Sequence, residues 1–299
     1  MVKIYIKWCE DQRPPVDPFT APVSAVANFL AFVHKDRNVG QAAVASFRSA
    51  ISKVHVGIDG MPLGKNVAIS NLVKGVGNLD PARRSRKPRY EGTWDMGPVL
   101  DALARLHPPH SLSPAVLSVK TLALVAMATI SRSSTLSIMS RKFSWKENEA
   151  EGGARQLFVD FLPGEQEKCG GRRGIFVAPL PGDPSLDPVA YLQFFKDTFP
   201  SEGEEQDGEV SAPLWVSSRK PHNPVKSVTL AGWMRKAMER GGVDLSRFKA
   251  HSVRSAAPAH LRKAKNLSLV QILARGGWKA TPDGSSKTFI RFYERVART

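Results

Sequence analysis

The chain has 299 residues, and its contents of 42% hydrophobic and 23% charged residues are those of a folded protein rather than a disordered one. Its 43 Lys and Arg residues against 27 Asp and Glu give a net charge of +16, which favours nucleic acid over an anionic membrane as the partner. Two cysteines without a CxxC spacing exclude a disulfide framework and a cysteine-based zinc module. We expect no secretory signal, no membrane span and a reducing intracellular compartment.

Residues 1–80 predict a small helical domain. Hydrophobic residues recur at helical spacing in a segment that Ser24 can cap, in a second segment after Gly40 and in a third over 66–77. No strand-like alternation interrupts the three segments.

The segment 81–94 separates this domain from the rest of the chain and is strongly basic. Five of the seven residues from 83 to 89 are Lys or Arg, and prolines flank and interrupt them. This pattern is typical of a solvated linker or a nuclear-localisation patch, and also of a linker that lies along DNA phosphates. The interpretations are compatible, and we expect a nuclear protein. The candidate DNA-binding residues are Arg83, Arg84, Arg86, Lys87 and Arg89.

Residues 95–299 predict a mainly helical domain with a small β-sheet. Asp95 can cap a first helix, and an apolar helix follows at 115–130. The segments 155–161 and 174–180 are strand-like and are joined by a Gly-rich turn. Further helices are expected at 187–199, 227–240, 252–265, 268–275 and 286–298, and a surface loop at the acidic segment 201–210.

Common nucleotide and metal motifs do not occur in the sequence. GMPLGKN at 60–66 has one spacer residue too few for a phosphate-binding loop, and Asn66 stands where Ser or Thr would hold magnesium. HPPH at 107–110 lacks further ligands, so a helix-ending turn is the better interpretation. No carboxylate cluster of a metal-dependent nuclease is visible near the basic residues. We therefore predict no metal and no cofactor.

Cleavage of DNA without a metal ion needs a definite set of side chains. When a nucleophile attacks a phosphodiester, negative charge spreads over the non-bridging oxygens and must be stabilised by fixed cations. Arginine suits this task because its planar fork binds phosphate through two hydrogen bonds and stays charged. The leaving oxygen also needs a proton from a positioned acid. The reaction thus calls for two arginines, a histidine, a lysine and a nucleophile.

The sequence contains candidates for the supporting residues. His251 and Arg254 in HSVR lie three positions apart and share a helix face. Arg132 ends an otherwise apolar helix, where a charge needs a reason, and Lys168 lies at the tip of the expected hairpin. Trp278 follows a Gly pair at the end of a short helix. Taken singly, each also fits an ordinary role as a core or solvent-exposed side chain.

The candidate nucleophile is Tyr293 in TFIRFYERVART, the last segment of the chain. It shares helical spacing with Phe289, Phe292 and Val296, so its neighbourhood alone favours core packing. The distant residues that could form a phosphate pocket change that interpretation, because the pocket lacks a nucleophile. The tyrosines at positions 5, 90 and 191 are not placed to fill the role.

In chain order, these residues resemble the catalytic domain of tyrosine recombinases. HSVRSAAPAHLRKAKNLSLVQILARGGW and TFIRFYERV are similar to the recombinases of DIRS and Ngaro retroelements, and AISKVHVGIDGMPLG, NLVKGV and PRYEGTWDMGPVL fit the same group. The resemblance covers most of the chain. It implies a helical core-binding domain over 1–80, a linker over 81–94 and an α+β catalytic domain over 95–299, which together form a C-shaped DNA clamp.

The resemblance implies a role for each supporting residue. Arg132 and Arg254 would clamp the scissile phosphate. His251 would hydrogen-bond the phosphate and help to manage the tyrosine proton. Lys168 would be the general acid for the 5′-oxygen, and Trp278 would pack against the phosphate region.

Tyr293 would attack the phosphate and give a 3′-phosphotyrosyl enzyme with a free 5′-hydroxyl. The covalent bond would conserve the phosphodiester energy, so strand exchange would need no metal or nucleotide. Two residues depart from the pattern. Thr135 stands where many members carry an acidic residue after the first arginine, and Pro258 interrupts the helix after HSVR.

The function implied is that of a site-specific DNA recombinase or integrase, serving a mobile element such as a retrotransposon. Its partner would be duplex DNA, with a homo-tetramer on synapsed sites, a monomer or dimer off DNA, and no membrane. Two alternatives remain open: relaxation of DNA by a type IB topoisomerase-like enzyme, and DNA binding by a domesticated protein without catalysis.

Overall fold

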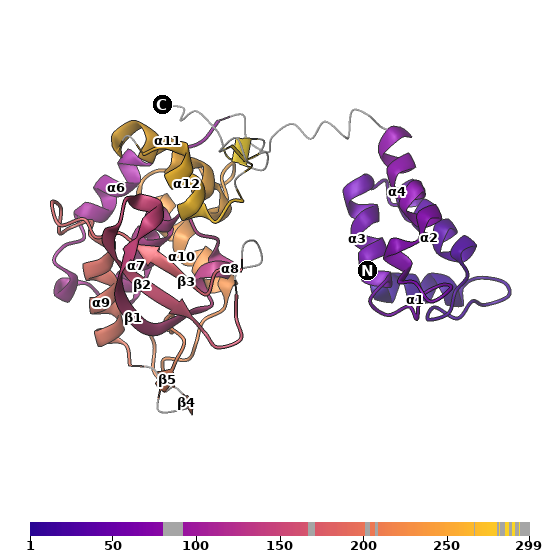
Figure 1. Cartoon of the computed structure of the whole chain (residues 1–299), viewed down its shortest axis with the longest axis horizontal. Helices are drawn as coiled ribbons and strands as arrows, with labels where there is room; N and C mark the ends of the chain where they lie inside the picture. Colours follow the sequence, from indigo (N-terminus) through magenta and orange to yellow (C-terminus); the bar gives the residue numbers. More distant parts are fainter. Residues whose placement is uncertain are drawn as a thin grey trace. The chain divides into compact units, whose positions relative to one another are not determined.

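The computed structural model describes residues 1–79, 92–166, 171–200, 204–206, 209–265, 267–279, 281, 285–286, 289–290 and 293. The chain forms two compact units, Met1–Arg89 and Tyr90–Thr299 (Figure 1). The division falls inside the segment 81–94. Each unit has its own hydrophobic core, which is what an independent domain requires.

In the part that the structure describes, the first unit is built mainly of helices. Its elements are α1 (Val2–Glu10), α2 (Val23–Asp36), α3 (Gln41–Ile51), the 3-10 turn η1 (Leu63–Lys65) and α4 (Val67–Leu79). The helices α2, α3 and α4 confirm the three helical segments expected from the apolar spacing.

Two details of the first unit differ from the sequence analysis. Helix α1 is not one of the three segments marked by apolar spacing; it joins the core through few residues, among them Tyr5, whose ring packs edge-on against Phe29 with centroids 4.9 Å apart. The cap assigned to Ser24 was wrong. Helix α2 begins directly after Pro22, which fixes a helix-compatible φ two positions earlier, so Ser24 lies inside the first turn.

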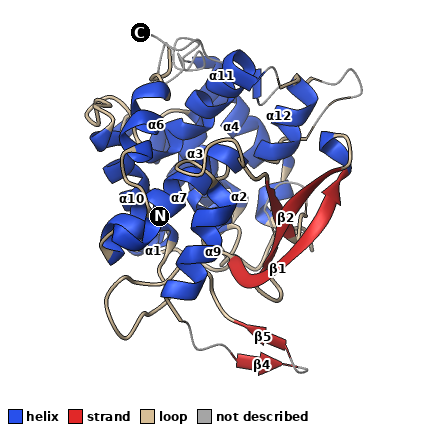
Figure 2. Ribbon diagram, turned by 90° about the vertical axis from the view of Figure 1, so that its left-hand side faces the viewer, coloured by secondary structure: helices blue, strands red, loops and turns tan. Residues whose placement is uncertain are grey.

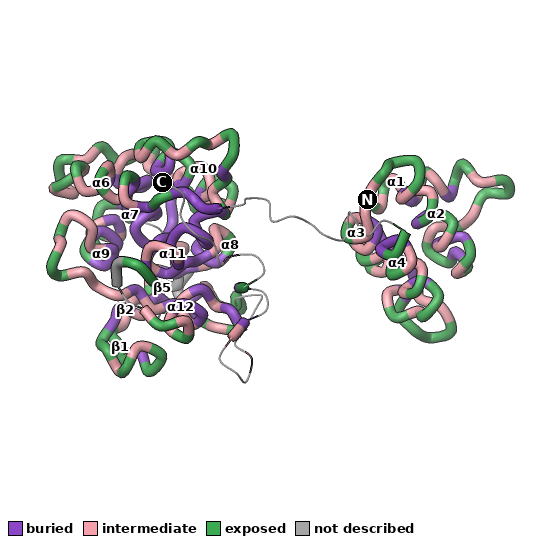
Figure 3. The backbone as a smooth tube through the Cα atoms, turned by 90° about the horizontal axis from the view of Figure 1, so that it is seen from above, coloured by how far each residue is buried: buried purple, intermediate pink, exposed green. Residues whose placement is uncertain are grey.

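Helices also make up most of the second unit, and α7 lies at its centre. The described α-helices are α6 (Gly97–Ala104), α7 (Pro114–Thr129), α8 (Ser133–Leu136), α9 (Pro188–Thr198), α10 (Ser227–Arg240), α11 (Val253–Lys265) and α12 (Leu269–Gly276). Nearly all of α7 from 117 to 129 is buried, as expected for a helix without a polar face (Figure 3). It contacts α9, α10, α11 and α12, so the other helices are arranged around it.

A three-stranded antiparallel sheet lies on the helical part of the second unit (Figure 2). Its order is β1 (Met139–Asn148), β2 (Ala154–Phe161) and β3 (Gly174–Val177), with the 3-10 turn η3 (Glu149–Glu151) between the first two. β2 and β3 confirm the predicted strands. β1 was missed because most of its side chains are not buried, so no clear apolar alternation marks it.

The acidic segment 201–210 was expected to be a loop, but its described residues form a small hairpin. The strands are β4 (Glu204–Gln206) and β5 (Glu209–Ser211), paired antiparallel. Their short length explains why no strand pattern is visible in the sequence.

Some of the described helices begin with a side-chain cap, whereas several others begin without one. The Asp187 carboxylate accepts hydrogen bonds from two backbone amides at the start of α9, which confirms the helix expected to begin there. Asp95 lies one residue outside the cap position of α6, although its carboxylate accepts a bond from the Gly97 amide. Ser268 and Gln271 form a capping box on α12. Pro258 does not end α11, which continues through it to Lys265.

Helix α7 also buries a polar cluster around Lys120, whose side chain has no exposed surface. Its Nζ donates to the Leu106 carbonyl at 2.6 Å and to the Tyr191 hydroxyl at 2.8 Å. The Tyr191 hydroxyl lies 3.0 Å from His107 Nδ1 and donates to the same carbonyl. Burial lowers the pKa of Lys120 to about 8, so its charged form destabilises the fold at lower pH.

This lowered pKa predicts a pH dependence of stability. Between pH 8 and 10.5 the unfolded chain binds more protons at Lys120 than the folded chain, so the free energy of unfolding should rise with pH by up to about 3 kcal/mol. The rise should be absent in Lys120→Met and retained in Lys3→Met, which changes an exposed lysine. Urea unfolding across this pH range measures it. Equal pH slopes in the wild type and Lys120→Met would contradict the assignment.

Candidate active site

The candidate active site lies in the second unit, where Tyr293 meets His251. The Tyr293 hydroxyl lies 2.9 Å from His251 Nε2, and the two rings are edge-on with centroids 5.7 Å apart. His251 is the middle residue of the 3-10 turn η4 (Ala250–Ser252) that precedes α11. The Tyr293 amide donates to the Phe289 carbonyl at 2.8 Å, which is the bond of a helical turn. Core packing of the apolar side of a helix would not require the contact between the Tyr293 hydroxyl and His251 Nε2.

Arg254 is packed against this pair and has no exposed surface. Its Nη1 donates to the Ile130 carbonyl at 2.6 Å, and its Nη2 donates to the Gly276 carbonyl at 2.9 Å. The guanidinium carbon lies 4.2 Å from the ring centroid of Trp278 and 5.1 Å from that of Tyr293. Two carbonyls and two aromatic rings therefore stabilise a buried positive charge. In this arrangement Arg254 offers no surface to a phosphate, although the resemblance implies that it clamps one.

Trp278 covers another side of the guanidinium and is 7% exposed. Its ring packs against Phe289 and Tyr293, each with centroids 4.9 Å apart. Gly276 is required beneath the indole because a Cβ there would overlap the ring, and Gly277 ends α12 with a φ of 62°. Among the described residues, no acceptor binds the buried Nε1 of Trp278. An acceptor atom of a ligand would find an unused donor there.

Arg132 occupies the N-cap position of α8, shortly after the end of α7. It is half-buried and lines, together with His251, a small cavity of about 30 Å³. Ile130, two positions earlier, has a φ of 52°, a costly conformation for a β-branched residue. Its carbonyl is the one that Arg254 binds. The strained turn thus brings Arg132 and Arg254 to one corner of the unit.

The surroundings of His251 keep its imidazole neutral. Burial of the ring lowers the pKa of His251 to about 4, and the positive charges of Arg254 and Arg132 act in the same direction. A neutral imidazole can accept a hydrogen bond from the Tyr293 hydroxyl, which a doubly protonated ring cannot. The residue keeps an exposed side, where a bound anion would offset the two arginines.

The structure brings together most of the residues singled out in the sequence. They are Arg132, His251, Arg254, Trp278 and Tyr293. Lys168 lies outside the described residues, as do the linker residues Arg83, Arg84, Arg86, Lys87 and Arg89. The catalytic and DNA-binding roles of all these residues stay predictions. Among the described residues, no group of three or more His, Cys, Asp or Glu could hold a metal ion. No helix in the described ranges is long and apolar enough to cross a membrane.

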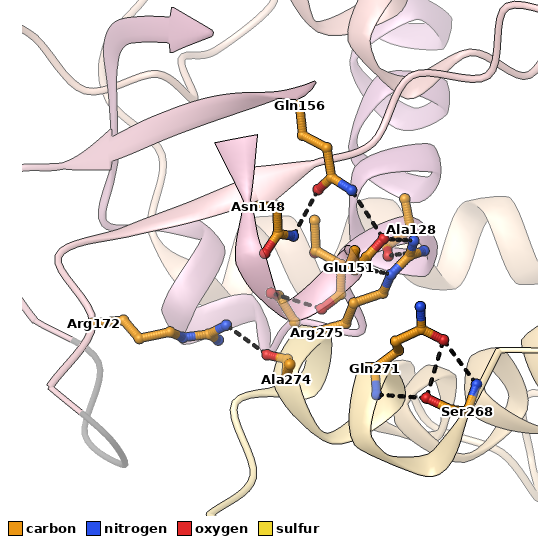
Figure 4. A network of polar contacts seen from close by, with 11 residues as sticks. Ala128, Asn148, Glu151, Gln156, Arg172, Ser268, Gln271, Ala274 and Arg275 are labelled. Atoms are coloured by element: carbon orange, nitrogen blue, oxygen red, sulfur yellow. Dashed lines mark hydrogen bonds and ion pairs between the residues drawn. The ribbon is translucent and has the colours of Figure 1, made fainter. Parts of the chain in front are cut away.

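An ion pair that the sequence did not indicate holds α12 next to the cluster formed by Arg132, His251, Arg254, Trp278 and Tyr293 (Figure 4). Arg275 donates from Nε and Nη2 to the two carboxylate oxygens of Glu151, at 2.5 Å each. Their side chains are 15% and 8% exposed, respectively. Gln156 also donates to Glu151 at 2.9 Å and accepts from Asn148 at 3.0 Å. The Glu151–Arg275 pair joins η3 to the last turn of α12.

Two further contacts hold this last turn in place. Arg275 Nη1 lies 3.5 Å from the Ala128 carbonyl near the end of α7, and Arg172 donates to the Ala274 carbonyl at 3.0 Å (Figure 4). The last turn of α12 is thus held just before the Gly-Gly-Trp segment. No sequence pattern indicates a pair of residues 124 positions apart. The local signal is a basic residue in the last turn of a helix, which the helix dipole alone explains.

The second unit has the fold of a tyrosine-recombinase catalytic domain, mainly helical with a small antiparallel sheet. Among solved structures, a lambda integrase dimer bound to a COC′ core site matches with a TM-score of 0.51 at 14% identity, over 100% of this chain and 89% of that chain. The fold of the chain is inferred from its similarity to this lambda integrase structure.

Two other solved structures are similar at TM-scores below 0.5. XerH site-specific recombinase bound to a palindromic difH substrate in a post-cleavage complex gives 0.49 at 13% identity, over 92% of this chain and 69% of that chain. The Tn1549 transposon integrase in complex with transposon right end DNA gives 0.46 at 10% identity, over 97% and 91%. No protein-family model and no curated protein matches the sequence.

Breaking one side of the Glu151–Arg275 pair should destabilise the protein by about 3 kcal/mol, because a buried charge loses its partner. We expect this loss for Glu151→Gln and for Arg275→Met, and a smaller loss for the double variant than the sum of both, measured by denaturant unfolding. The control Asp11→Asn breaks an exposed pair with Lys7 at 3.7 Å and should cost about 0.5 kcal/mol or less. Strictly additive losses would show that the two side chains do not stabilise each other.

Proposed function

We propose that this protein is a site-specific DNA recombinase or integrase that cuts and rejoins duplex DNA through a 3′-phosphotyrosyl intermediate, without metal or nucleotide. The observation that carries the proposal is the contact of the Tyr293 hydroxyl with His251 Nε2 at 2.9 Å, within a cluster that contains Arg254 and Trp278. The tyrosine-recombinase fold supports the same function.

The chemistry follows from the groups in contact. The phenol oxygen of Tyr293 attacks phosphorus while its proton passes to the neutral Nε2 of His251. The phosphorus–tyrosine bond forms as the bond to the 5′-oxygen breaks, and Lys168 supplies the proton of that leaving oxygen. Arg132, Arg254 and the indole N–H of Trp278 stabilise the negative charge on the non-bridging oxygens. The reverse sequence rejoins the strand.

This proposal requires a rearrangement of the structure described above. Arg254 has no exposed surface, and the ring of Tyr293 is one of the groups that cover it. A phosphate can reach the guanidinium only after that ring moves. We therefore assign the structure to the DNA-free, closed state, which DNA binding would open.

The partner proposed is duplex DNA. The net charge of +16 attracts a polyanion, and the basic side chains of the linker can contact DNA phosphates. Lambda integrase and XerH are DNA-bound in the matching structures. We further propose assembly into a tetramer on synapsed sites, a nuclear location, and an origin in a mobile element related to DIRS or Ngaro retroelements.

The decisive experiment tests Tyr293 as the nucleophile. The substrates are nicked duplexes, selected from a random DNA library by their binding to the protein. After cleavage next to the nick, the short strand segment is lost and cannot be rejoined, so the covalent intermediate is trapped. The wild type should form a denaturant-stable protein–DNA adduct, and Tyr293→Phe should form none. Tyr5→Phe, in the core of the first unit, is the matched control and should form as much adduct as the wild type.

Other outcomes distinguish the remaining interpretations. An adduct in Tyr293→Phe would exclude Tyr293 as the nucleophile. Tight binding without any adduct in the wild type would favour the second candidate, a DNA-binding protein without catalysis, which the complete burial of Arg254 also fits. Relaxation of supercoiled DNA by a single molecule without synapsis would favour a type IB topoisomerase-like activity.

The linker should determine much of the salt dependence of DNA binding. The plot of log K against log salt has a negative slope. Replacing Arg83, Arg84 and Arg86 by glutamine should make this slope less steep, by about 0.9 for each side chain that contacts a phosphate. The same positions changed to lysine keep the charge and should keep the slope. Fluorescence anisotropy with a labelled duplex at several salt concentrations measures it. An unchanged slope in the glutamine variant would contradict phosphate contacts by the linker.

A further inference from the structure

Trp94 makes a buried hydrogen bond to the turn that carries His251. The indole Nε1 donates to Ser252 Oγ at 2.8 Å, across 158 positions of the chain. Trp94 is 5% exposed and packs in the core of the second unit, and Ser252 is also buried. Since the bond lies in the interior, losing it would leave a polar atom without a partner.

Ser252 connects the hydrogen bond from Trp94 to the rest of the turn η4. Its hydroxyl donates to the Lys249 carbonyl at 2.6 Å, and its amide donates to the same carbonyl at 2.8 Å. The hydroxyl thus accepts from Trp94 and donates to the residue at the start of the turn. His251 lies between the two ends of this turn, so the turn fixes the position from which its imidazole extends.

Trp94 is also close in the sequence to the basic segment. It follows the last basic residue of that segment, Arg89, by five positions, and the residues from Gly92 to Trp94 are buried in the second unit. The point where the chain enters the second unit is therefore hydrogen-bonded to the turn of His251. A force or displacement of the chain at this point would act on that turn.

We propose that Trp94 is a positioning residue: through Ser252 it fixes the turn of His251 and couples the entry of the basic linker into the second unit to the orientation of that histidine. The inference rests on the proposed function, in which His251 accepts the proton of Tyr293 and must be held in position to do so. It adds a site of control that lies outside the cluster around Arg254.

The experiment compares Trp94→Phe, which keeps a packed ring but loses the N–H, with Ser252→Ala, which loses the hydroxyl. Ser252→Thr keeps the hydroxyl and is the conservative control. The first measurement is the NMR titration of His251 in the full-length, DNA-free protein, with its resonance assigned by His251→Gln. In the described part of the chain, the groups that face the imidazole are Arg254, Arg132 and the Tyr293 hydroxyl, and all three remain in these variants.

A positioning role predicts that the titration of His251 moves from about pH 4 toward the ordinary histidine value in Trp94→Phe and Ser252→Ala, because the imidazole becomes more exposed and moves away from Arg254 and Arg132. Ser252→Thr should titrate as the wild type does. Adduct formation on the nicked duplexes should slow about tenfold in the first two variants at unchanged DNA affinity. The acid limb of the rate–pH profile should shift in the same direction as the titration.

Two results would overturn the inference. One is an unchanged His251 titration in Trp94→Phe, even with a lower melting temperature, since that describes a purely structural tryptophan. The other is a shifted titration with adduct formation at the wild-type rate. Failure of the proposed function is separate: the wild type itself would then form no adduct, while the NMR titration, which needs no DNA, would still test whether Trp94 holds the turn.

Discussion

The buried charge of Arg254 is the constraint on which the cluster depends. A guanidinium removed from water must be met by fixed dipoles, and here it is met by the carbonyls of Ile130 and Gly276. Both carbonyls lie at C-terminal ends of helices, α7 and α12, where the helix dipole favours a cation. One side chain therefore sets the distance between two helix ends. The left-handed backbone at Ile130 carries one of these carbonyls, and the missing side chain at Gly276 leaves room for the Trp278 ring that covers the guanidinium.

The cluster is held from two sides through contacts to the backbone rather than by residues inside it. On one side the Glu151–Arg275 pair fixes the last turn of α12, and on the other the Trp94–Ser252 bond fixes the turn of His251. Ser252 is next to His251 in the sequence, and Arg275 is next to Gly276, whose carbonyl binds Arg254. Such support fixes the backbone on both sides of the cluster.

The sequence indicated those features that leave a local trace. Helical spacing, the helix start at Asp187 and the Gly pair before Trp278 depend on neighbouring residues, and each was found where expected. β1 left no such trace because its side chains are mostly not buried. The burial of Arg254 could not be predicted either, because it results from contacts with Ile130 and Tyr293, which are distant in the chain. The sequence could name residues that the structure brings together, but not their closed arrangement.

The stacking of Tyr293 on Arg254 makes the tyrosine a competitor of the substrate it is proposed to attack. Ring and phosphate both need access to one guanidinium, so the apparent affinity for DNA is the intrinsic affinity multiplied by the fraction of molecules in which the ring has moved away. A sequence that binds too weakly to displace the ring leaves the site closed. Selectivity for a target would then arise partly inside the protein, before any base is read.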